Sequence, residues 1–180
     1  MELFRERGYA DVTIAEIAVR ARLTKRTFFN HYADKREVLF AGAQAFEASV
    51  VRYLTEADDL DPIDAAVAAL GRGGRDLAHY GDSAHARREL IASSPDLQER
   101  ELIKMTSLAA ALAEALRRRH VPSRIATFAA QAAVAIFTAA YDDWADDTTA
   151  DFSALMQRSL SDLRQAIGCA QANGNSPRPF

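Results

Sequence analysis

The residues of this sequence best suited to binding another molecule lie between Arg20 and Arg36. This stretch holds six lysines and arginines but one acid, Asp34. Residues 1–40 carry a net charge of +2, whereas the whole chain of 180 residues has a net charge of -3. A local excess of positive charge is typical of a surface that binds a polyanion such as DNA. The alternative is an ordinary basic surface that faces only solvent.

The sequence offers no candidate catalytic residues. The sequence contains no Gly-x-Ser-x-Gly, phosphate-binding or dinucleotide-binding motif, and Gly71-Arg72-Gly73-Gly74 lies in a helical pattern with no strand before it. His79 and His85 have no third ligand at a usable spacing. We therefore predict that the protein is not an enzyme and holds neither a metal nor a cofactor.

The elements that must position the basic residues are predicted to be helices, because no stretch alternates with a period of two. Three short helices fit the first 35 residues, over 1–7, 13–20 and 24–32. Thr13 and Thr24 are suitable N-caps for the second and third helices. A fourth helix is predicted to begin at Asp34 and to run to about Thr55.

The second and third helices, joined by Ala21-Arg22-Leu23, have the dimensions of a helix-turn-helix motif. In that motif the second helix enters the major groove of DNA, while the first crosses the backbone. Here the second helix opens with Thr24-Lys25-Arg26-Thr27, which offers hydrogen-bond donors and no carboxylate. Lys35 follows at the start of the next predicted helix, where a phosphate is favoured.

Several segments of the first module resemble the DNA-binding signature of the TetR family of transcriptional regulators. They are LFRERGY at residues 3–9, TIAEIA at 13–18, TFFNHY at 27–32 and Asp34-Lys35. The resemblance implies an all-α fold, with an N-terminal three-helix helix-turn-helix domain and a larger helical ligand-binding and dimerisation domain. We expect the DNA-binding domain over 1–45, the effector-binding and dimerisation domain over 46–170, and a disordered tail over 171–180.

The motif and the resemblance together predict the DNA contacts, with base reading by some of Arg26, Thr27 and Asn30. Arg22 stands where the family usually has glycine, and a left-handed conformation there costs about 1 kcal/mol. Phe29 replaces a tyrosine whose hydroxyl commonly touches phosphate, and Arg26 is a candidate to offset that loss. The predicted DNA-binding residues are Thr13, Thr24, Lys25, Arg26, Thr27, Phe29, Asn30, His31 and Lys35.

The second module is predicted to contain helices over about 62–80, 83–93, 95–119, 122–146 and 149–169. Gly71, Gly73 and Gly74 predict a kink or a split in the first of them. An effector pocket is expected between the helices of 62–119 and the inner face of the helix after Pro122, with core packing as the alternative role of each residue. Its predicted lining is mostly apolar, which favours a small, mostly apolar effector. The predicted lining residues are Tyr80, Arg87, Ile91, Met105, Leu108, Phe128, Phe137, Tyr141 and Trp144.

The helix after Pro122 is apolar nearly all round, so it must be covered on both sides. Together with an apolar stripe on the last helix, it predicts an intersubunit four-helix bundle, as the resemblance implies. An ordinary core within one chain is the alternative. The predicted homodimer interface is Ile125, Ala129, Ala133, Ile136, Ala140, Leu155, Leu160 and Leu163.

The first residues of the chain, its longest uncharged stretch and its single cysteine indicate the cellular compartment. The first nine residues are too charged for a signal peptide, and the uncharged run 125–141 is short and rich in alanine, which predicts a buried helix and no membrane partner. Cys169 is the one cysteine, which suits a reducing compartment, so a cytoplasmic protein is expected.

The predicted function is a ligand-responsive DNA-binding transcriptional regulator. Its expected partners are double-stranded DNA, a small-molecule effector and a second copy of the chain. We expect a repressor that its effector releases from a pseudo-palindromic operator. The alternative is a helical ligand-binding or interaction module whose DNA binding is impaired because its first helix is short.

Overall fold

The computed structural model describes residues 2–57, 60–76 and 81–172, and most of these residues are helical with no strand among them. This confirms the predicted all-α fold. The predicted tail lies almost entirely outside the described residues. The elements in chain order are α1 (Glu2–Arg7), α2 (Ile14–Arg20), α3 (Lys25–His31), the 3-10 helix η1 (Arg36–Val38), α4 (Ala43–Thr55), α5 (Pro62–Asp76), α6 (Gly81–Ala92), α7 (Pro95–Arg118), α8 (Ser123–Asp146) and α9 (Phe152–Ala172).

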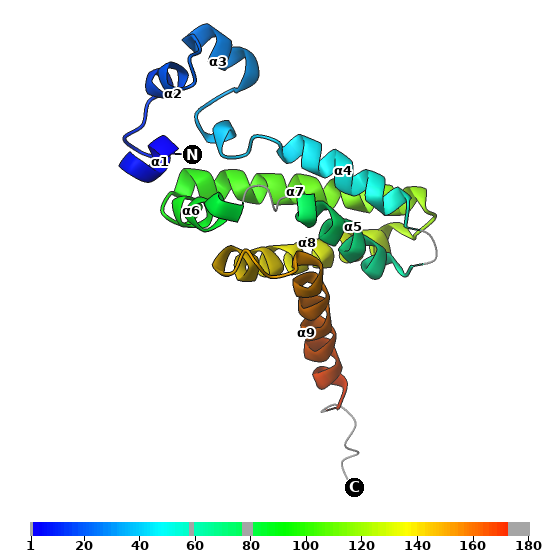
Figure 1. The fold of residues 1–180 in the computed structure, drawn as a ribbon. Coiled ribbons are helices and arrows are strands. Elements are labelled where there is room, and N and C mark those ends of the chain that lie inside the picture. Colours follow the sequence, from blue (N-terminus) through cyan, green and yellow to red (C-terminus); the bar gives the residue numbers. More distant parts are fainter. Residues whose placement is uncertain (1, 58–59, 77–80, 173–180) are drawn as a thin grey trace, which may run out of the picture.

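The first three helices form a small module at one end of the molecule (Figure 1). Thr13 caps α2 as predicted, since its Oγ1 accepts a hydrogen bond from the Glu16 backbone N–H at 3.3 Å while the Glu16 carboxylate accepts from the Thr13 N–H at 2.8 Å. Thr24 caps α3, with its Oγ1 accepting from the Thr27 N–H at 3.0 Å. Because each cap satisfies backbone donors that the first turn of a helix leaves free, both helices begin where the sequence predicted.

The helix predicted from Asp34 to Thr55 is wrong, because it is interrupted between η1 and α4. After Val38 the chain turns inward and buries Leu39 and Phe40, which are 6% and 5% exposed. Gly42 then takes a φ of +87°, a left-handed value that glycine adopts without strain, and α4 begins at Ala43. We call residues 39–42 the connecting segment.

The connecting segment lies in a small apolar cluster that joins the two modules. Phe4 and Val12 from the first module meet Leu39 and Phe40 there, and the other side is supplied by α6 and the start of α7. Leu90, Ile91 and Leu97 are the buried members from that side. We call this set the junction cluster, and it attaches the small module to the body of the protein.

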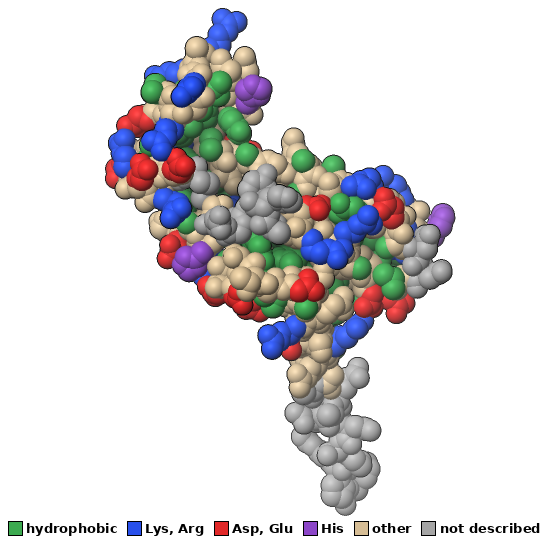
Figure 2. Space-filling model, in the orientation of Figure 1, with side chains coloured by type: hydrophobic (Ala, Val, Ile, Leu, Met, Phe, Trp, Pro, Cys, Tyr) green, Lys and Arg blue, Asp and Glu red, His purple; other side chains and the backbone are tan. Residues whose placement is uncertain are grey.

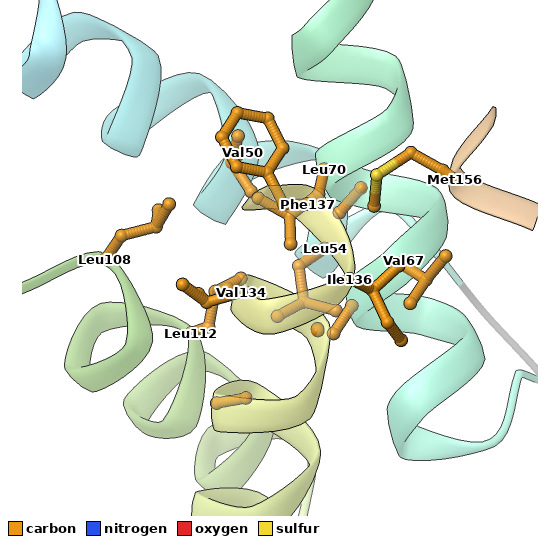
Figure 3. Close-up of a cluster of buried hydrophobic side chains, with 14 of the residues drawn as sticks. Val50, Leu54, Val67, Leu70, Leu108, Leu112, Val134, Ile136, Phe137 and Met156 are labelled. Carbon is orange, nitrogen blue, oxygen red and sulfur yellow. The ribbon is translucent and has the colours of Figure 1, made fainter. Parts of the chain in front are cut away.

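The larger core fills the body, where α8 packs against α5, α7 and α9. α8 is long and apolar enough to cross a membrane by length and composition alone, yet ten of its residues are buried in this core. This confirms the prediction of a buried helix. Figure 3 shows side chains from α4, α5, α7, α8 and α9 meeting in the core: Val50, Leu54, Val67, Leu70, Leu108, Leu112, Val134, Ile136, Phe137 and Met156.

Gly73 and Gly74 of α5 lie in close helix packing, and the predicted split is wrong because α5 continues unbroken from Pro62 to Asp76. A Cβ atom added at Gly74 would lie 2.1 Å from Cε1 of Phe152 on α9. At Gly71 an added Cβ would meet nothing closer than 3.6 Å, an ordinary contact. Gly74 therefore allows Phe152 to pack directly on the α5 backbone.

We predict opposite effects on stability for alanine at these two glycines. Gly74→Ala should lower the free energy of unfolding by about 1–3 kcal/mol, because the buried Phe152 ring must move. Gly71→Ala should raise it by about 0.5–1 kcal/mol, because alanine restricts the unfolded chain and fits the helix. Urea denaturation of both variants checks this, and equal effects at the two positions would contradict the packing role of Gly74.

Candidate nucleic-acid interface and ligand cavity

The face of α3 that points to solvent carries most of the predicted DNA contacts. Phe28 is 1% exposed and anchors the helix, with its ring 5.3 Å from that of Tyr32. The opposite face is open to solvent, and Figure 2 shows basic side chains gathered at this end of the molecule. The predicted contacts exposed on α3 are Lys25, Arg26, Phe29, Asn30 and His31.

Phe29 is 54% exposed, which is unusual for a large apolar side chain. Its ring meets that of Phe28 edge-on at 5.6 Å, so the buried neighbour fixes its direction. An exposed aromatic ring on a groove-facing helix can contact sugars or the methyl group of thymine, although it cannot donate to phosphate.

The turn between α2 and α3 contains a non-glycine residue in a left-handed conformation. Arg22 has a φ of +56°, in the left-handed region. Its N–H donates to the Val19 carbonyl at 3.0 Å, and the Leu23 N–H donates to the Ala18 carbonyl at 2.8 Å. This pair of bonds closes the end of α2 and sets the angle at which α3 leaves it.

Lys35 was predicted to bind phosphate, and the structure corrects this. Its ammonium group donates to the carbonyl oxygens of Tyr9 at 2.7 Å, Val12 at 2.9 Å and Ala10 at 3.4 Å. It also lies 4.2 Å from the centre of the Tyr9 ring. An ammonium has three donors, so these contacts occupy it fully. Lys35 therefore ties the loop between α1 and α2 to the start of η1.

Ion pairs beside Lys35 join η1 to α7. Arg100 Nη2 lies 3.1 Å from Asp34 Oδ2, and Lys104 Nζ lies 3.0 Å from Glu37 Oε2. Arg100 Nε is 3.2 Å from Glu37 Oε1 but is not aligned for a hydrogen bond. The hydrogen bond from Arg36 is the main cause that lowers the pKa of Asp34 to about 2. Asp34 thus stays charged at neutral pH and keeps its ion pair with Arg100 on α7.

A cavity of about 1430 Å³ lies between α4, α6, α7 and α8, and residues 38–43 form part of its wall. It exceeds the roughly 300–1,000 Å³ usual for small-molecule sites. Its lining on α7 reaches from Gln98 to Arg117, which corresponds to roughly 28 Å along a helix axis. The middle is apolar, whereas charged side chains lie toward both ends.

Six of the predicted pocket residues line this cavity: Arg87, Ile91, Met105, Phe137, Tyr141 and Trp144. Two were wrong. Leu108 is 3% exposed and packs in the larger core, while Phe128 is 60% exposed on the outer surface. Tyr80 lies outside the described residues. Among the described residues, no three His, Cys, Asp or Glu side chains are grouped so that they could hold a metal ion.

Part of the cavity lining comes from the first half of the chain and was not predicted from the sequence. Leu39, Phe40 and Gly42 of the connecting segment, together with Phe46 on α4, face the cavity. The one signal for this was the Phe40-Ala41-Gly42 sequence, which interrupts the helical pattern. Lys104 and Gln131 were also missed, because polar residues on long helices resemble an ordinary solvated face.

The predicted dimer interface is wrong for five residues, which are already buried in a single chain. Ala133 and Ala140 on α8 are 0% exposed because α5, α7 and α9 cover that helix, and Leu160 on α9 is 1% exposed because α9 packs against α5 and α8. Ala129 and Ile136 are 7% and 4% exposed. These side chains pack in the core of one chain, so they cannot meet a partner. Of the predicted set, Ile125, Leu155 and Leu163 remain at least partly exposed.

Comparisons with known proteins cover both modules. Residues 1–41 match the family model described as bacterial regulatory proteins, tetR family, and residues 60–168 match the model described as the MftR C-terminal domain. The transposon Tn10 TetC protein of Escherichia coli is 36% identical over 58 residues, which is 32% of this chain and 29% of that protein. The match thus spans less than a third of that relative.

Two solved structures from Thermus thermophilus are also similar. FadR, a TetR family repressor in complex with lauroyl-CoA, has a TM-score of 0.53 and 24% identity, covering 100% of this chain and 93% of that one. The TetR family regulator PfmR has a TM-score of 0.48 and 20% identity, covering 90% of this chain and 92% of that one. The likeness to FadR supports a common fold.

We predict that Lys25 and Lys35 differ in how they affect DNA binding. Lys25→Ala should reduce the salt dependence of binding by about one ion, because an exposed cation at a phosphate releases a counterion. Lys35→Ala should leave that slope unchanged and lower the free energy of unfolding by about 1–3 kcal/mol, because carbonyl acceptors lose their donor. Binding titrations over a range of salt concentrations and thermal denaturation measure both quantities. A smaller slope with unchanged stability for Lys35→Ala would restore its phosphate role.

Proposed function

This chain belongs to the TetR family of transcriptional regulators, and from that premise we propose that it is a repressor that leaves its operator when an effector occupies the cavity. The observation that carries the proposal is the position of residues 38–43. They form part of the cavity wall and they also lead directly from the DNA-binding module. A ligand in the cavity would therefore touch the segment that connects the DNA-binding module to the body.

The DNA side of the proposal rests on α3. Its exposed face offers Lys25, Arg26 and Asn30, which are donors for phosphate and for base edges, and α3 contains no carboxylate. Arg26 and Asn30 lie four residues apart, on one face of the helix. We propose that these two side chains read bases while Lys25 binds the backbone.

A homodimer would present two copies of α3 to successive major grooves, one turn or about 34 Å apart. Its support is a set of exposed apolar side chains on the last two helices. Ile125 and Phe128 on α8 are 52% and 60% exposed, and Ile167 on α9 is 59% exposed. Residues 164–168 are all exposed, where α9 extends away from the body (Figure 1). We propose that a second copy covers these side chains.

The proposed effector is mostly apolar, since the middle of the cavity is lined by Met105, Ala109, Val134 and Phe137. Lauroyl-CoA, the ligand named for the Thermus FadR structure, is a suitable first probe. We propose that the protein acts in the cytoplasm, where its DNA target and a reduced Cys169 are both expected.

The alternative function, a ligand-binding module with impaired DNA binding, depends on the short α1. This helix has six residues, yet Phe4 is 2% exposed and packs in the junction cluster. Arg20 Nη2 donates to the Glu2 carboxylate at 2.6 Å, which links α1 to α2. Because α1 is held on both sides, we favour the DNA-binding function.

The experiment that tests this function is selection of DNA from a random library by the purified full-length protein. We expect a pseudo-palindromic sequence whose half-site centres lie about 10–10.5 base pairs or a multiple apart. Arg26→Ala should relax one position in each half-site, at a cost of about 1–3 kcal/mol. No enriched sequence would contradict the repressor and favour the alternative. An unchanged sequence for Arg26→Ala would remove that residue from base reading.

We predict that Ile167→Asp dissociates the dimer without unfolding the chain, because a charge would have to be buried in an apolar interface. Light scattering should then give a mass near 19.7 kDa in place of twice that value. The matched control is Ile103→Asp, an exposed isoleucine on α7 with 49% exposure, which should leave the dimer intact. A dimeric Ile167→Asp protein with a native helical spectrum would exclude this surface.

A further inference from the structure

Arg87 on α6 connects the cavity to the connecting segment. Its side chain is 24% exposed and forms part of the cavity wall. Its Nε donates to the backbone carbonyl of Leu39, and its Nη1 donates to Glu101 on α7, both at 3.3 Å. The guanidinium carbon also lies 5.1 Å from the Phe40 ring and 5.9 Å from the Tyr141 ring. One side chain therefore contacts the connecting segment, α7 and α8.

The two hydrogen bonds of Arg87 use its Nε and Nη1, and each measures 3.3 Å, at the long end for N–H···O bonds. A guanidinium has five N–H donors, and the acceptor of the Nε donor is an uncharged carbonyl. An anion that binds a guanidinium with two parallel bonds forms shorter, stronger contacts, at about 2.7–2.9 Å. An anionic group in the cavity would therefore compete well for the Arg87 donors.

The other cations of the cavity wall are less suited to this role. Arg88 donates to the Asp142 carbonyl at 2.7 Å and also pairs with Asp146, both on α8, so it has no bond to the DNA-binding module among these contacts. Arg117 pairs with Glu114 on its own helix. Lys104 does contact η1 through Glu37, but Glu37 would still lie beside Arg100 if Lys104 moved.

We propose that Arg87 couples the cavity to the DNA-binding module, and that the effector carries an anionic oxygen that draws its guanidinium away from the Leu39 carbonyl. This inference rests on the proposed function and specifies the chemistry of its ligand. An apolar body would occupy the middle of the cavity, and a carboxylate, sulfonate or phosphate oxygen would lie at Arg87. Once the bond to Leu39 is lost, the connecting segment loses a polar attachment to the body. The ion pairs of Arg100 with Asp34 and of Lys104 with Glu37 remain.

Two probes of similar shape test the inference: 8-anilinonaphthalene-1-sulfonate, which is anionic, and N-phenyl-1-naphthylamine, which lacks the sulfonate. Hydrogen exchange of peptides covering residues 38–43, measured without DNA, reports how firmly the connecting segment is attached. Affinity for the selected operator reports on regulation. In the wild-type protein we expect the sulfonate to speed exchange and to weaken operator binding by about fivefold or more. The uncharged amine should bind and change neither quantity.

Two arginine variants distinguish coupling between the cavity and the DNA-binding module from a general loosening of the connecting segment. Arg87→Gln should abolish both effects of the sulfonate, so that operator affinity changes by less than about twofold on adding it. Arg100→Gln removes a cation of the same junction that does not line the cavity. It should speed exchange without any probe and still respond to the sulfonate. Ala135→Trp, which places an indole ring in part of the cavity, should weaken sulfonate binding itself.

Three results would overturn the inference. They are an equal response to the two probes, a full sulfonate response in Arg87→Gln, or sulfonate binding that Ala135→Trp leaves unchanged. If the wild-type protein binds no operator but the sulfonate still speeds exchange through Arg87, the proposed repressor function fails while the coupling stands. Circular dichroism of each variant verifies that it is folded.

Discussion

The burial of Leu39 and Phe40 is the constraint on which the rest of this structure depends. Both side chains can reach the junction cluster only if the helix stops after Val38, so the chain needs a turn before α4. Gly42 supplies that turn in a left-handed conformation. The same burial brings the backbone of the connecting segment against Arg87 and into the cavity wall. Attachment of the DNA-binding module and the shape of the ligand site thus have a common origin.

The body of the protein combines tight packing with a large open volume. On one side of α8, alanines and the glycines of α5 allow backbones to approach closely, as Gly74 does under Phe152. Phe137 and Trp144 also line the cavity, and their ring centres lie 5.7 and 5.9 Å from that of Phe152. The cavity is therefore bounded partly by the closely packed core and partly by the connecting segment.

Local features of this fold could be predicted from the sequence, whereas features that depend on distant segments could not. The caps at Thr13 and Thr24 involve residues close together in the chain. Lys35 looked like a phosphate ligand because its partners, the carbonyls of Tyr9 to Val12, are distant in the chain. Leu108 and Phe128 both fit an apolar helix face, and only the packing of α7 and α8 decides that one is core and the other surface. The alanines of α8 misled the dimer prediction for the same reason.

The position of the connecting segment bears on the affinity of the DNA-bound protein for its ligand. Under the proposed function, a ligand would displace this segment and an operator would hold it, so the two would act on one element in opposite directions. Thermodynamic reciprocity would then require the operator to weaken ligand binding by the same factor by which the ligand weakens operator binding. A protein bound to its operator would consequently bind the ligand less tightly than the free protein. The ligand concentration needed for release from DNA would therefore be higher than the dissociation constant measured for the isolated protein.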